Sequence, residues 1–458
     1  MKTLLLAFLL AAVCCAQSPP LPATTAPDAA GVTTDPLSAA ALRKDVSYLA
    51  SDDLEGRATP SRGLDLAADF LEKRHRTLGL KPLFGEAFRE GPMLADATKA
   101  SLSIHFADET VTLDASAFLQ AAQTPLQHER LPLQHVDAAQ SARTSAESGT
   151  ASEHALLLDG APSAAALARA TRRKAKIVLI EETSADALGA RVPVVVLGRE
   201  LAEKLRAHPD ALVSVTIPAG TKPFATNVGA LLEGRDATLK SRCIVVSAHY
   251  DHIGIGKPVK GDAIRNGADD DASGTAGVLA LAAAMATTPA RRSILFVHFY
   301  GEESGFLGSR RFVTQPPRAL AQIDAVFNLE MLGRPDDIGA DCAWITGFGL
   351  SEFGERVAKS GAVHKMRFFE HPRYSKMLFS GSDNLPFAEA GVVAHSISSG
   401  SLHKDYHQPS DEADTLDYNN MAKVVGALLH AVRDMADADT APAWVPGSRY
   451  AEAAARLR

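Results

Sequence analysis

The sequence predicts an α/β fold: a mixed, mostly parallel central sheet with helices on both faces, plus a β-rich domain inserted into it. From about residue 226, continuous apolar runs alternate with helical periodicity, which is typical of strands buried on both faces. Between residues 95 and 225 the apolar runs are shorter and β-like. The chain of 458 residues is 46% hydrophobic and 22% charged, so it can build the cores of two to three globular domains.

The first residues predict a signal peptide over residues 1–16. A short basic start precedes an apolar run over residues 4–13. That run is shorter than the roughly 20 residues needed to cross a bilayer. Small residues before Gln17 indicate a cleavage site, so we expect export to the periplasm or the extracellular space. A lipoprotein signal at Cys14 or Cys15 is the alternative, but no leucine stands at the expected place before the cysteine.

The region after the leader is rich in Pro, Ala and Thr up to residue 36, and this composition predicts a linker over residues 17–36. Helical periodicity then covers residues 38–50 and 63–78, with a loop predicted over residues 51–57. The predicted domains are an α/β domain over residues 37–94 and 226–436, a β-rich insert over residues 95–225, and a C-terminal tail over residues 437–458.

Short β-like runs fill the predicted insert, and no cluster of chemically reactive side chains accompanies them. Residues 120–152 are rich in Ala, Gln and Ser without a clear period, so we predict a loop there. The predicted strands cover residues 102–106, 110–113, 155–158, 176–180 and 194–197.

The α/β domain shows four buried strands and two helices in alternation. The predicted strands cover residues 243–248, 293–300, 323–329 and 392–397, and the helices cover residues 273–285 and 416–435.

Charge and cysteine content exclude two classes of protein. The net charge is −7 and no long basic run is present, which argues against a nucleic-acid partner. Two of the 4 cysteines lie in the leader, so this is not a disulfide scaffold. Cys243 and Cys342 remain; they can pair in an oxidising compartment, but two buried free thiols are the favoured interpretation.

Imidazole and carboxylate side chains follow the ends of the predicted strands. In open α/β sheets, ligands bind beyond the carboxyl ends of the strands, so we expect these side chains to meet at one rim. The candidates are His249 after the first strand, Glu302 and Glu303 after the second, Glu330 after the third, Asp270 before a helix, and His407 in a late loop.

These residue types suit a zinc centre that activates water. Zinc binds histidine nitrogen and carboxylate oxygen, and a catalytic site keeps one position open. Two ions about 3.5–4 Å apart need a bridging carboxylate, and a further carboxylate must stay free to accept a proton. Glu302 and Glu303 suit this division, because adjacent residues at a strand end point in different directions. Asp270, or else its neighbours Asp269 or Asp271, can supply the bridging carboxylate.

Five ordered blocks within residues 248–411 resemble the zinc-dependent aminopeptidases related to glutamate carboxypeptidase II, transferrin receptor and glutaminyl cyclase. The segment over residues 49–57 also looks like the opening of these enzymes, and many of them carry a protease-associated domain where this chain has its insert. The blocks are AHYDHIG (248–254), GADDDASG (267–274), GEESGFLGS (301–309), NLEM (328–331) and YHQPSD (406–411).

The resemblance implies a zinc exopeptidase fold and a role for each matching residue. It implies two Zn²⁺ ions per chain, one on His249 and Glu330, the other on Glu303 and His407. The resemblance selects Asp270 as the bridge between them. It also implies that Glu302 is the general base, that Asp251 orients His249, and that Tyr406 helps to stabilise the oxyanion.

Two positions depart from the family pattern. Position 330 is often aspartate, and the longer arm of Glu330 can change the spacing or affinity of the metal. Relatives often have histidine at the position of Asn384, which is not a predicted ligand. The remaining histidines near the motifs are expected to be structural or solvent-exposed; these are His252, His298, His371, His395 and His403.

The predicted function is a secreted zinc metalloaminopeptidase that hydrolyses the first peptide bond of peptides with a free N-terminus. Two other enzyme functions stay open on the same scaffold: glutaminyl cyclase, which uses one zinc, and carboxypeptidase or dipeptidase. A binding protein that has lost catalysis, as transferrin receptor has, is the alternative outside the enzymes. The sequence predicts neither the preferred side chain nor the oligomeric state.

Overall fold

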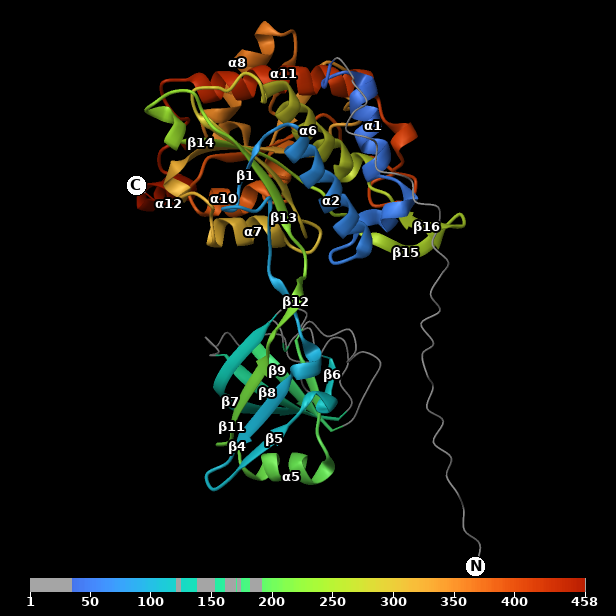
Figure 1. Cartoon of the computed structure of the whole chain (residues 1–458), viewed down its shortest axis with the longest axis vertical. Helices are drawn as coiled ribbons and strands as arrows, with labels where there is room; N and C mark the ends of the chain where they lie inside the picture. Colours follow the sequence, from blue (N-terminus) through green and yellow to red (C-terminus); the bar gives the residue numbers. More distant parts are fainter. Residues whose placement is uncertain are drawn as a thin grey trace, which may run out of the picture.

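The computed structural model describes residues 35–120, 125–137, 153–160, 170, 174–181 and 192–457. The predicted signal peptide and residues 17–34 of the predicted linker lie outside the described residues. The described residues form two lobes, one around a nine-stranded sheet and one around an eight-stranded sheet (Figure 1). We call them the α/β lobe and the β lobe.

The sheet of the α/β lobe is mixed, and this confirms the predicted fold class. Its strand order is β1-β13-β17-β14-β18-β21-β19-β20, with β2 also paired to β13. Neighbours from β17 to β21 run parallel, whereas β13 and β19 join this group antiparallel. The bounds are β1 Lys81–Pro82, β2 Arg89–Glu90, β13 Asn227–Leu232, β14 Cys243–His249, β17 Ser293–Phe299, β18 Ile323–Leu329, β19 Cys342–Ile345, β20 Arg367–Phe369 and β21 Ala394–Ser398.

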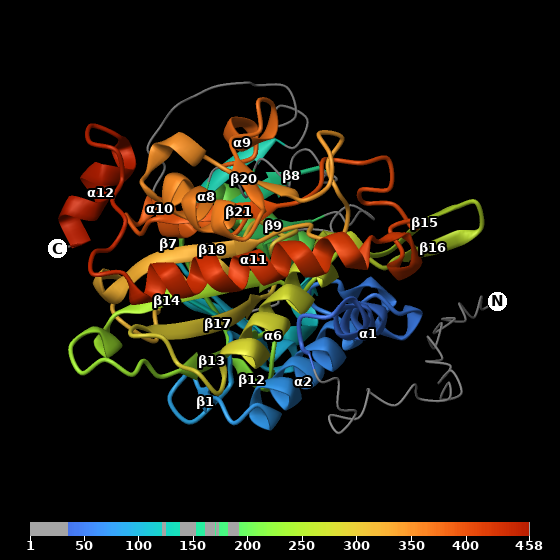
Figure 2. The same cartoon turned by 90° about the horizontal axis from the view of Figure 1, so that it is seen from above.

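Both faces of this sheet are buried under helices, which explains why its strands are apolar throughout. Successive residues of β14 alternate between two cores: Ile244 lies in the core with α1, α2, α6, α8 and α11, and Val245 in the core with α7, α10 and α12. The long helix α11 crosses the first face (Figure 2). The bounds are α1 Ala39–Leu49, α2 Arg62–Thr77, α6 Gly274–Met285, α7 Leu307–Thr314, α8 Phe353–Val363, α9 Tyr374–Met377, α10 Asn384–Glu389, α11 Tyr418–Asp437 and α12 Arg449–Leu457.

The β lobe contains the five predicted strands and four further elements that were not predicted, namely β6, β7, α5 and β11. The predicted loop over residues 120–152 is wrong for β7, Leu126–Asp137, which pairs with β11 on one side and β8 on the other. Only Leu131 of this strand is fully buried, so backbone pairing rather than an apolar pattern defines it. The bounds are β4 Ser101–His105, β5 Thr110–Leu113, β6 Phe118–Gln120, β7 Leu126–Asp137, β8 His154–Asp159, β9 Ala175–Ile180, β10 Val194–Val196, α5 Arg199–Ala207 and β11 Leu212–Ile217.

The chain enters and leaves the β lobe through two paired strands, β3 (Met93–Ala95) and β12 (Ala219–Pro223), which lie between the lobes in Figure 1. The predicted boundary before residue 95 falls within β3, and the boundary after residue 225 falls just beyond β12. The predicted tail over residues 437–458 is not a free tail, because α12 packs against the α/β lobe and Trp444 and Tyr450 are buried.

Two further predictions can be compared with the described residues. Cys243 and Cys342 are buried free thiols, which confirms the favoured interpretation over a disulfide. Within the described part of the chain, no helix has the length and apolar character needed to cross a membrane.

Candidate metal centre

The candidate site lies at the carboxyl ends of three neighbouring parallel strands. His249 is the last residue of β14, and Glu330 directly follows β18. Glu302 and Glu303 follow β17 after a turn at Gly301, whose φ is +69°. The strand ends therefore bring the predicted residues to one rim, as expected for an open α/β sheet.

Asp270 lies at the centre of the site, in the turn Ala268–Ser273 before α6. Its side chain is buried, and its two oxygens face different imidazoles: Oδ1 lies 3.3 Å from His249 Nε2, and Oδ2 lies 3.1 Å from His407 Nε2. The two alternative bridges point elsewhere. Asp271 Oδ1 accepts the backbone N–H groups of Gly274 and Met331, each at 3.0 Å. Asp269 Oδ1 accepts the backbone N–H of a glycine at 2.7 Å.

The first cluster of possible ligands consists of His249, Asp270 and Glu330. Glu330 Oε1 lies 3.2 Å from His249 Nε2, so this nitrogen faces two carboxylates. The other oxygen of Glu330 accepts a hydrogen bond from Ser382 Oγ at 2.6 Å. His249 Nδ1 lies 3.1 Å from the backbone oxygen of Asp251 and 3.5 Å from its Oδ1, which leaves Nε2 as the atom directed at the cluster.

The second cluster consists of His252, Asp270, Glu303 and His407. Glu303 Oε1 lies 3.2 Å from His407 Nε2 and 2.9 Å from His252 Nδ1. His252, which was expected to be structural or solvent-exposed, is buried within this cluster. It stands three residues after His249 in the same motif, and the chain turns back at the end of β14.

Several buried polar atoms of the second cluster lack a hydrogen-bond partner among the described residues. An unpaired buried polar group costs about 1–3 kcal/mol, so a group of them indicates a missing charged partner. Imidazole nitrogen and carboxylate oxygen are the ligands that zinc prefers, so the residues fit that metal. The unpaired atoms are Asp270 Oδ2, Glu303 Oε1, His407 Nε2 and both ring nitrogens of His252.

In the metal-free protein, burial and neighbouring charges shift the pKa values of Glu302 and Asp270 in opposite directions. Burial raises the pKa of Glu302 well above its usual range, and Glu330 adds to this rise against the opposing effect of His249. Burial also acts to raise the pKa of Asp270, but the imidazoles of His252, His249 and His407 outweigh it and hold that pKa well below its usual range. Asp270 is therefore anionic, while Glu302 can hold a proton.

A buried arginine lies behind the site and connects its loops. The predicted loop over residues 51–57 is a short 3-10 helix, Asp52–Arg57, that ends in this residue. Arg57 donates hydrogen bonds to backbone oxygens of Tyr250 at 2.8 Å, Asn266 at 2.7 Å and Gly267 at 3.1 Å, and also to that of Leu49. These contacts join the turn after β14 to the turn that carries Asp270.

A cavity of about 310 Å³ lies in front of the two clusters. The carboxylates of Asp270, Glu302, Glu303 and Glu330 are among the lining residues, and no Arg or Lys of the described chain is. Tyr406 also lines it and stacks on His407 with ring centroids 3.9 Å apart. Apolar side chains also line the cavity, namely Phe306, Met331, Trp344, Leu378 and Leu402.

Asn384 and His298, which were not predicted to be ligands, lie outside both clusters. Asn384 is buried, donates to the backbone oxygen of Phe379 at 2.9 Å and accepts from Ser396 Oγ at 2.9 Å, so it is not placed as a ligand. His298 is buried against His75, with 3.1 Å between their Nε2 atoms.

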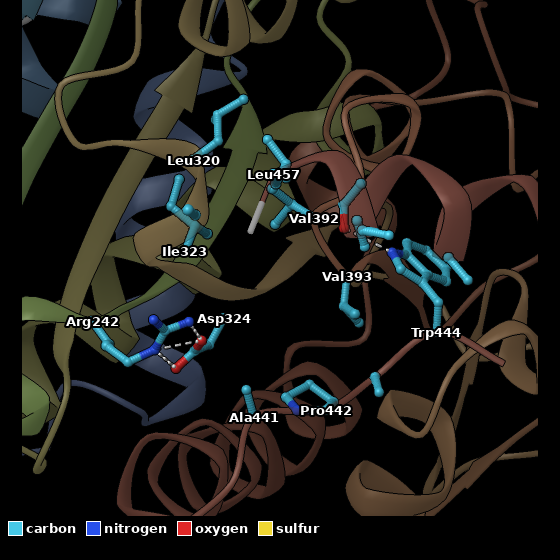
Figure 3. A pocket seen from close by; sticks show the side chains of 16 residues that line it. Arg242, Leu320, Ile323, Asp324, Val392, Val393, Ala441, Pro442, Trp444 and Leu457 are labelled. Carbon is cyan, nitrogen blue, oxygen red and sulfur yellow. Dashed lines mark hydrogen bonds and ion pairs between the residues drawn. The ribbon is translucent and has the colours of Figure 1, made fainter. Parts of the chain in front are cut away.

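A second cavity, of about 200 Å³, lies at the opposite end of the strands beside the start of β18 (Figure 3). Its charged groups are already paired, because Asp324 accepts hydrogen bonds from Arg242 Nε at 2.9 Å and from Arg292 Nε at 2.6 Å. No histidine among the described residues lines it, so these residues do not reproduce the imidazole and carboxylate groups of the candidate site.

The donor set at the carboxyl ends of the strands fits a metal-binding domain, and the comparisons with known proteins agree with this. Residues 227–432 match the family model "Peptidase family M28". "Aminopeptidase YwaD" of Bacillus subtilis is 26% identical over 253 residues, which cover 53% of this chain and 52% of that protein. A "Probable zinc metalloprotease" of Pyrenophora teres is 34% identical over 108 residues, which cover 24% of this chain and 23% of that protein. The part of the chain over residues 227–432 is therefore similar to peptidase family M28.

The fold similarity extends over both lobes. A solved structure of BSAP, a zinc aminopeptidase from Bacillus subtilis, aligns with a TM-score of 0.51 and 18% identity, covering 88% of this chain and 96% of that one. This similarity concerns the fold alone. The chain spans about half the length, or less, of the two curated relatives named above.

Proposed function

We propose that this chain is an exported aminopeptidase that holds two zinc ions and releases the first residue of peptides. The observation that supports it best is the position of Asp270, whose two oxygens face two separate groups of ligands 3.3 and 3.1 Å away. The predicted leader supports export. The β lobe then corresponds to a protease-associated-like insert.

In this proposal His249 and Glu330 hold one ion, Glu303 and His407 hold the other, and Asp270 holds both. When bound, two zinc ions polarise the peptide carbonyl and lower the pKa of a water molecule. Proton transfer and hydrogen bonding to the oxyanion are assigned to side chains of the protein.

Glu302 is the proposed proton carrier. It lines the cavity but belongs to neither ligand group, and its raised pKa suits a group that accepts a proton from water and then donates it to the leaving amine. Asp251 fixes this residue, because its Oδ1 accepts the backbone N–H of Glu302 at 3.1 Å. Tyr406 faces the same cavity and is the proposed donor to the oxyanion.

The charge of the cavity favours the amino end of a peptide over the carboxyl end. Of the four carboxylates that line it, Asp270, Glu303 and Glu330 would be ligands of the metals, which leaves Glu302 as the carboxylate available to a terminal ammonium group. A carboxypeptidase needs a cation for the terminal carboxylate, and no basic side chain of the described chain lines this cavity. The apolar lining around Trp344 and Leu378 favours an uncharged, apolar first side chain.

Release of amino acids from a panel of aminoacyl-nitroanilides tests this function. We expect release with apolar residues, loss of release with a chelator, and recovery on addition of zinc. Glu302→Gln should keep its zinc and lose turnover. Pyroglutamate formation with one zinc per chain would favour a glutaminyl cyclase instead, and a protein without bound zinc would favour a binding protein.

A further inference from the structure

We infer that His252 is a ligand of the ion held by Asp270, Glu303 and His407, so that the two metal positions are unequal. This inference rests on the proposed two-metal site. The position at His407 then has two imidazoles and two carboxylates. The position at His249 has one imidazole and two carboxylates. The first of these is the stronger zinc site.

The distances place a ring nitrogen of His252 among the other ligands. Its Nδ1 lies 2.9 Å from Glu303 Oε1 and 3.8 Å from Asp270 Oδ2. One ligand atom from each of the four residues lies within 4.8 Å of every other, a spacing that fits a single ion. The rings of His252 and His407 are 5.4 Å apart and inclined at 76°, so the two imidazoles approach from different directions.

The ring of His252 is held in this position by its surroundings. The side chain is buried, and the backbone N–H donates to the oxygen of Arg57 at 3.2 Å. Gly267 lies directly against the ring: a Cβ atom built there would lie 2.6 Å from two ring carbons. Position 267 also has φ = +57°, a conformation that favours glycine. The backbone therefore approaches the ring closely and restricts its movement.

A purely structural role for His252 explains these contacts less well than a role as a metal ligand. Buried histidines usually use their ring nitrogens in hydrogen bonds, yet neither nitrogen of His252 has a hydrogen-bond partner with good geometry among the described residues. The approach to Glu303 is short but not aligned as a hydrogen bond. A cation between these atoms would satisfy the imidazole and the carboxylate together.

Unequal sites predict ordered loading. The ion at the position with two imidazoles should bind first and most tightly. The position at His249 should fill second and should tolerate harder ions such as Mn²⁺, because carboxylates make up more of its ligand set.

Titration of the metal-free full chain with Co²⁺, followed by calorimetry and visible absorption, tests this inference. We expect two binding steps in the unmodified protein. His252→Phe keeps the ring volume without nitrogen, and His252→Gln keeps a hydrogen-bond donor in place of a good ligand. Both should weaken the first step by at least about tenfold and change its absorption, while the second step persists. The persisting second step shows that the variant is folded.

His403→Gln is the matched control, because this histidine contacts Asp269 at 3.1 Å and lies outside both clusters. It should leave the first step unchanged. Wild-type binding by His252→Gln would overturn the inference and reduce His252 to a donor that positions Glu303. Two normal Co²⁺ steps without peptidase activity would instead contradict the proposed function and leave the inference standing.

Discussion

Asp251 accepts a hydrogen bond from the backbone N–H of Glu302 at 3.1 Å, and the same carboxylate oxygen lies 3.5 Å from His249 Nδ1. The buried carboxylate of Asp251 therefore positions both His249, a proposed metal ligand, and Glu302, the proposed proton carrier. Removing its charge should disturb the two together. Partners of this kind typically contribute about 10–100-fold in metal affinity or activity.

We predict that Asp251→Asn lowers kcat by about 10–100-fold, because the amide cannot stabilise His249 as the carboxylate does. Turnover of the best nitroanilide and zinc content by mass spectrometry measure this effect. Ser410→Ala is a suitable control, since Ser410 is exposed and its hydroxyl donates a hydrogen bond to Asp405, which lies outside both clusters. Unchanged kcat in Asp251→Asn would contradict the role assigned to Asp251.

Arg57 should contribute strongly to the stability of the α/β lobe. Replacement by methionine leaves the backbone oxygens of Leu49, Tyr250, Asn266 and Gly267 without this donor, at about 1–3 kcal/mol for each group left unpaired. We therefore expect Arg57→Met to lower the free energy of unfolding by about 3 kcal/mol or more. Urea unfolding followed by tryptophan fluorescence measures it.

This fluorescence reports the α/β lobe alone, since both tryptophans, Trp344 and Trp444, belong to it. Arg43→Met is the control: Arg43 is exposed and pairs with Asp414 on the surface, so the loss should stay below about 1 kcal/mol. Equal losses in Arg57→Met and Arg43→Met would show that the buried hydrogen bonds of Arg57 contribute no more to the free energy of unfolding than a surface ion pair does.

The buried pair His75 and His298 predicts a loss of stability in acid. Burial, assisted by Arg74, lowers the pKa of His75 to about 3 from 6.5, and burial with the neighbouring His75 lowers the pKa of His298. Between pH 6.5 and 3 the unfolded chain binds protons that the folded chain does not. The contribution of this pair to the free energy of unfolding is therefore fully present above pH 6.5 and is lost progressively as the pH decreases through this window.

His75→Phe should remove this contribution from position 75. Each group costs at most about 1.4 kcal/mol per pH unit, so the fall in stability from pH 6.5 to 4.5 should be about 2 kcal/mol smaller in the variant. Urea unfolding at a series of pH values checks it. The same pH dependence in His75→Phe and in the unmodified protein would mean that the pair does not titrate as described.

The strands that carry the site were predictable because both of their faces are buried. β14, β17 and β18 are fully buried, and such strands are continuous apolar runs in sequence. β7 was missed because backbone pairing with two neighbours defines it, and only Leu131 is fully buried. The helix α12 was missed because its place depends on packing against distant elements.

Part of the candidate site was also predictable from the sequence. His249, Glu303 and Glu330 follow predicted strands, so their convergence followed from the topology of the sheet. The position of His252 was not predictable, because it depends on Arg57 and Gly267, which reach the turn after β14 from other parts of the chain. Periodicity carries no information on such contacts.

Zinc content of the purified protein, measured together with its turnover, tests the central claim most directly. The geometry around Asp270 predicts two zinc ions per chain, and full release of N-terminal residues only when both are bound. Asp270→Ala should retain less than one ion and no activity, because it removes a ligand from both groups. Full turnover with one zinc per chain, or with Asp270→Ala, would contradict the account.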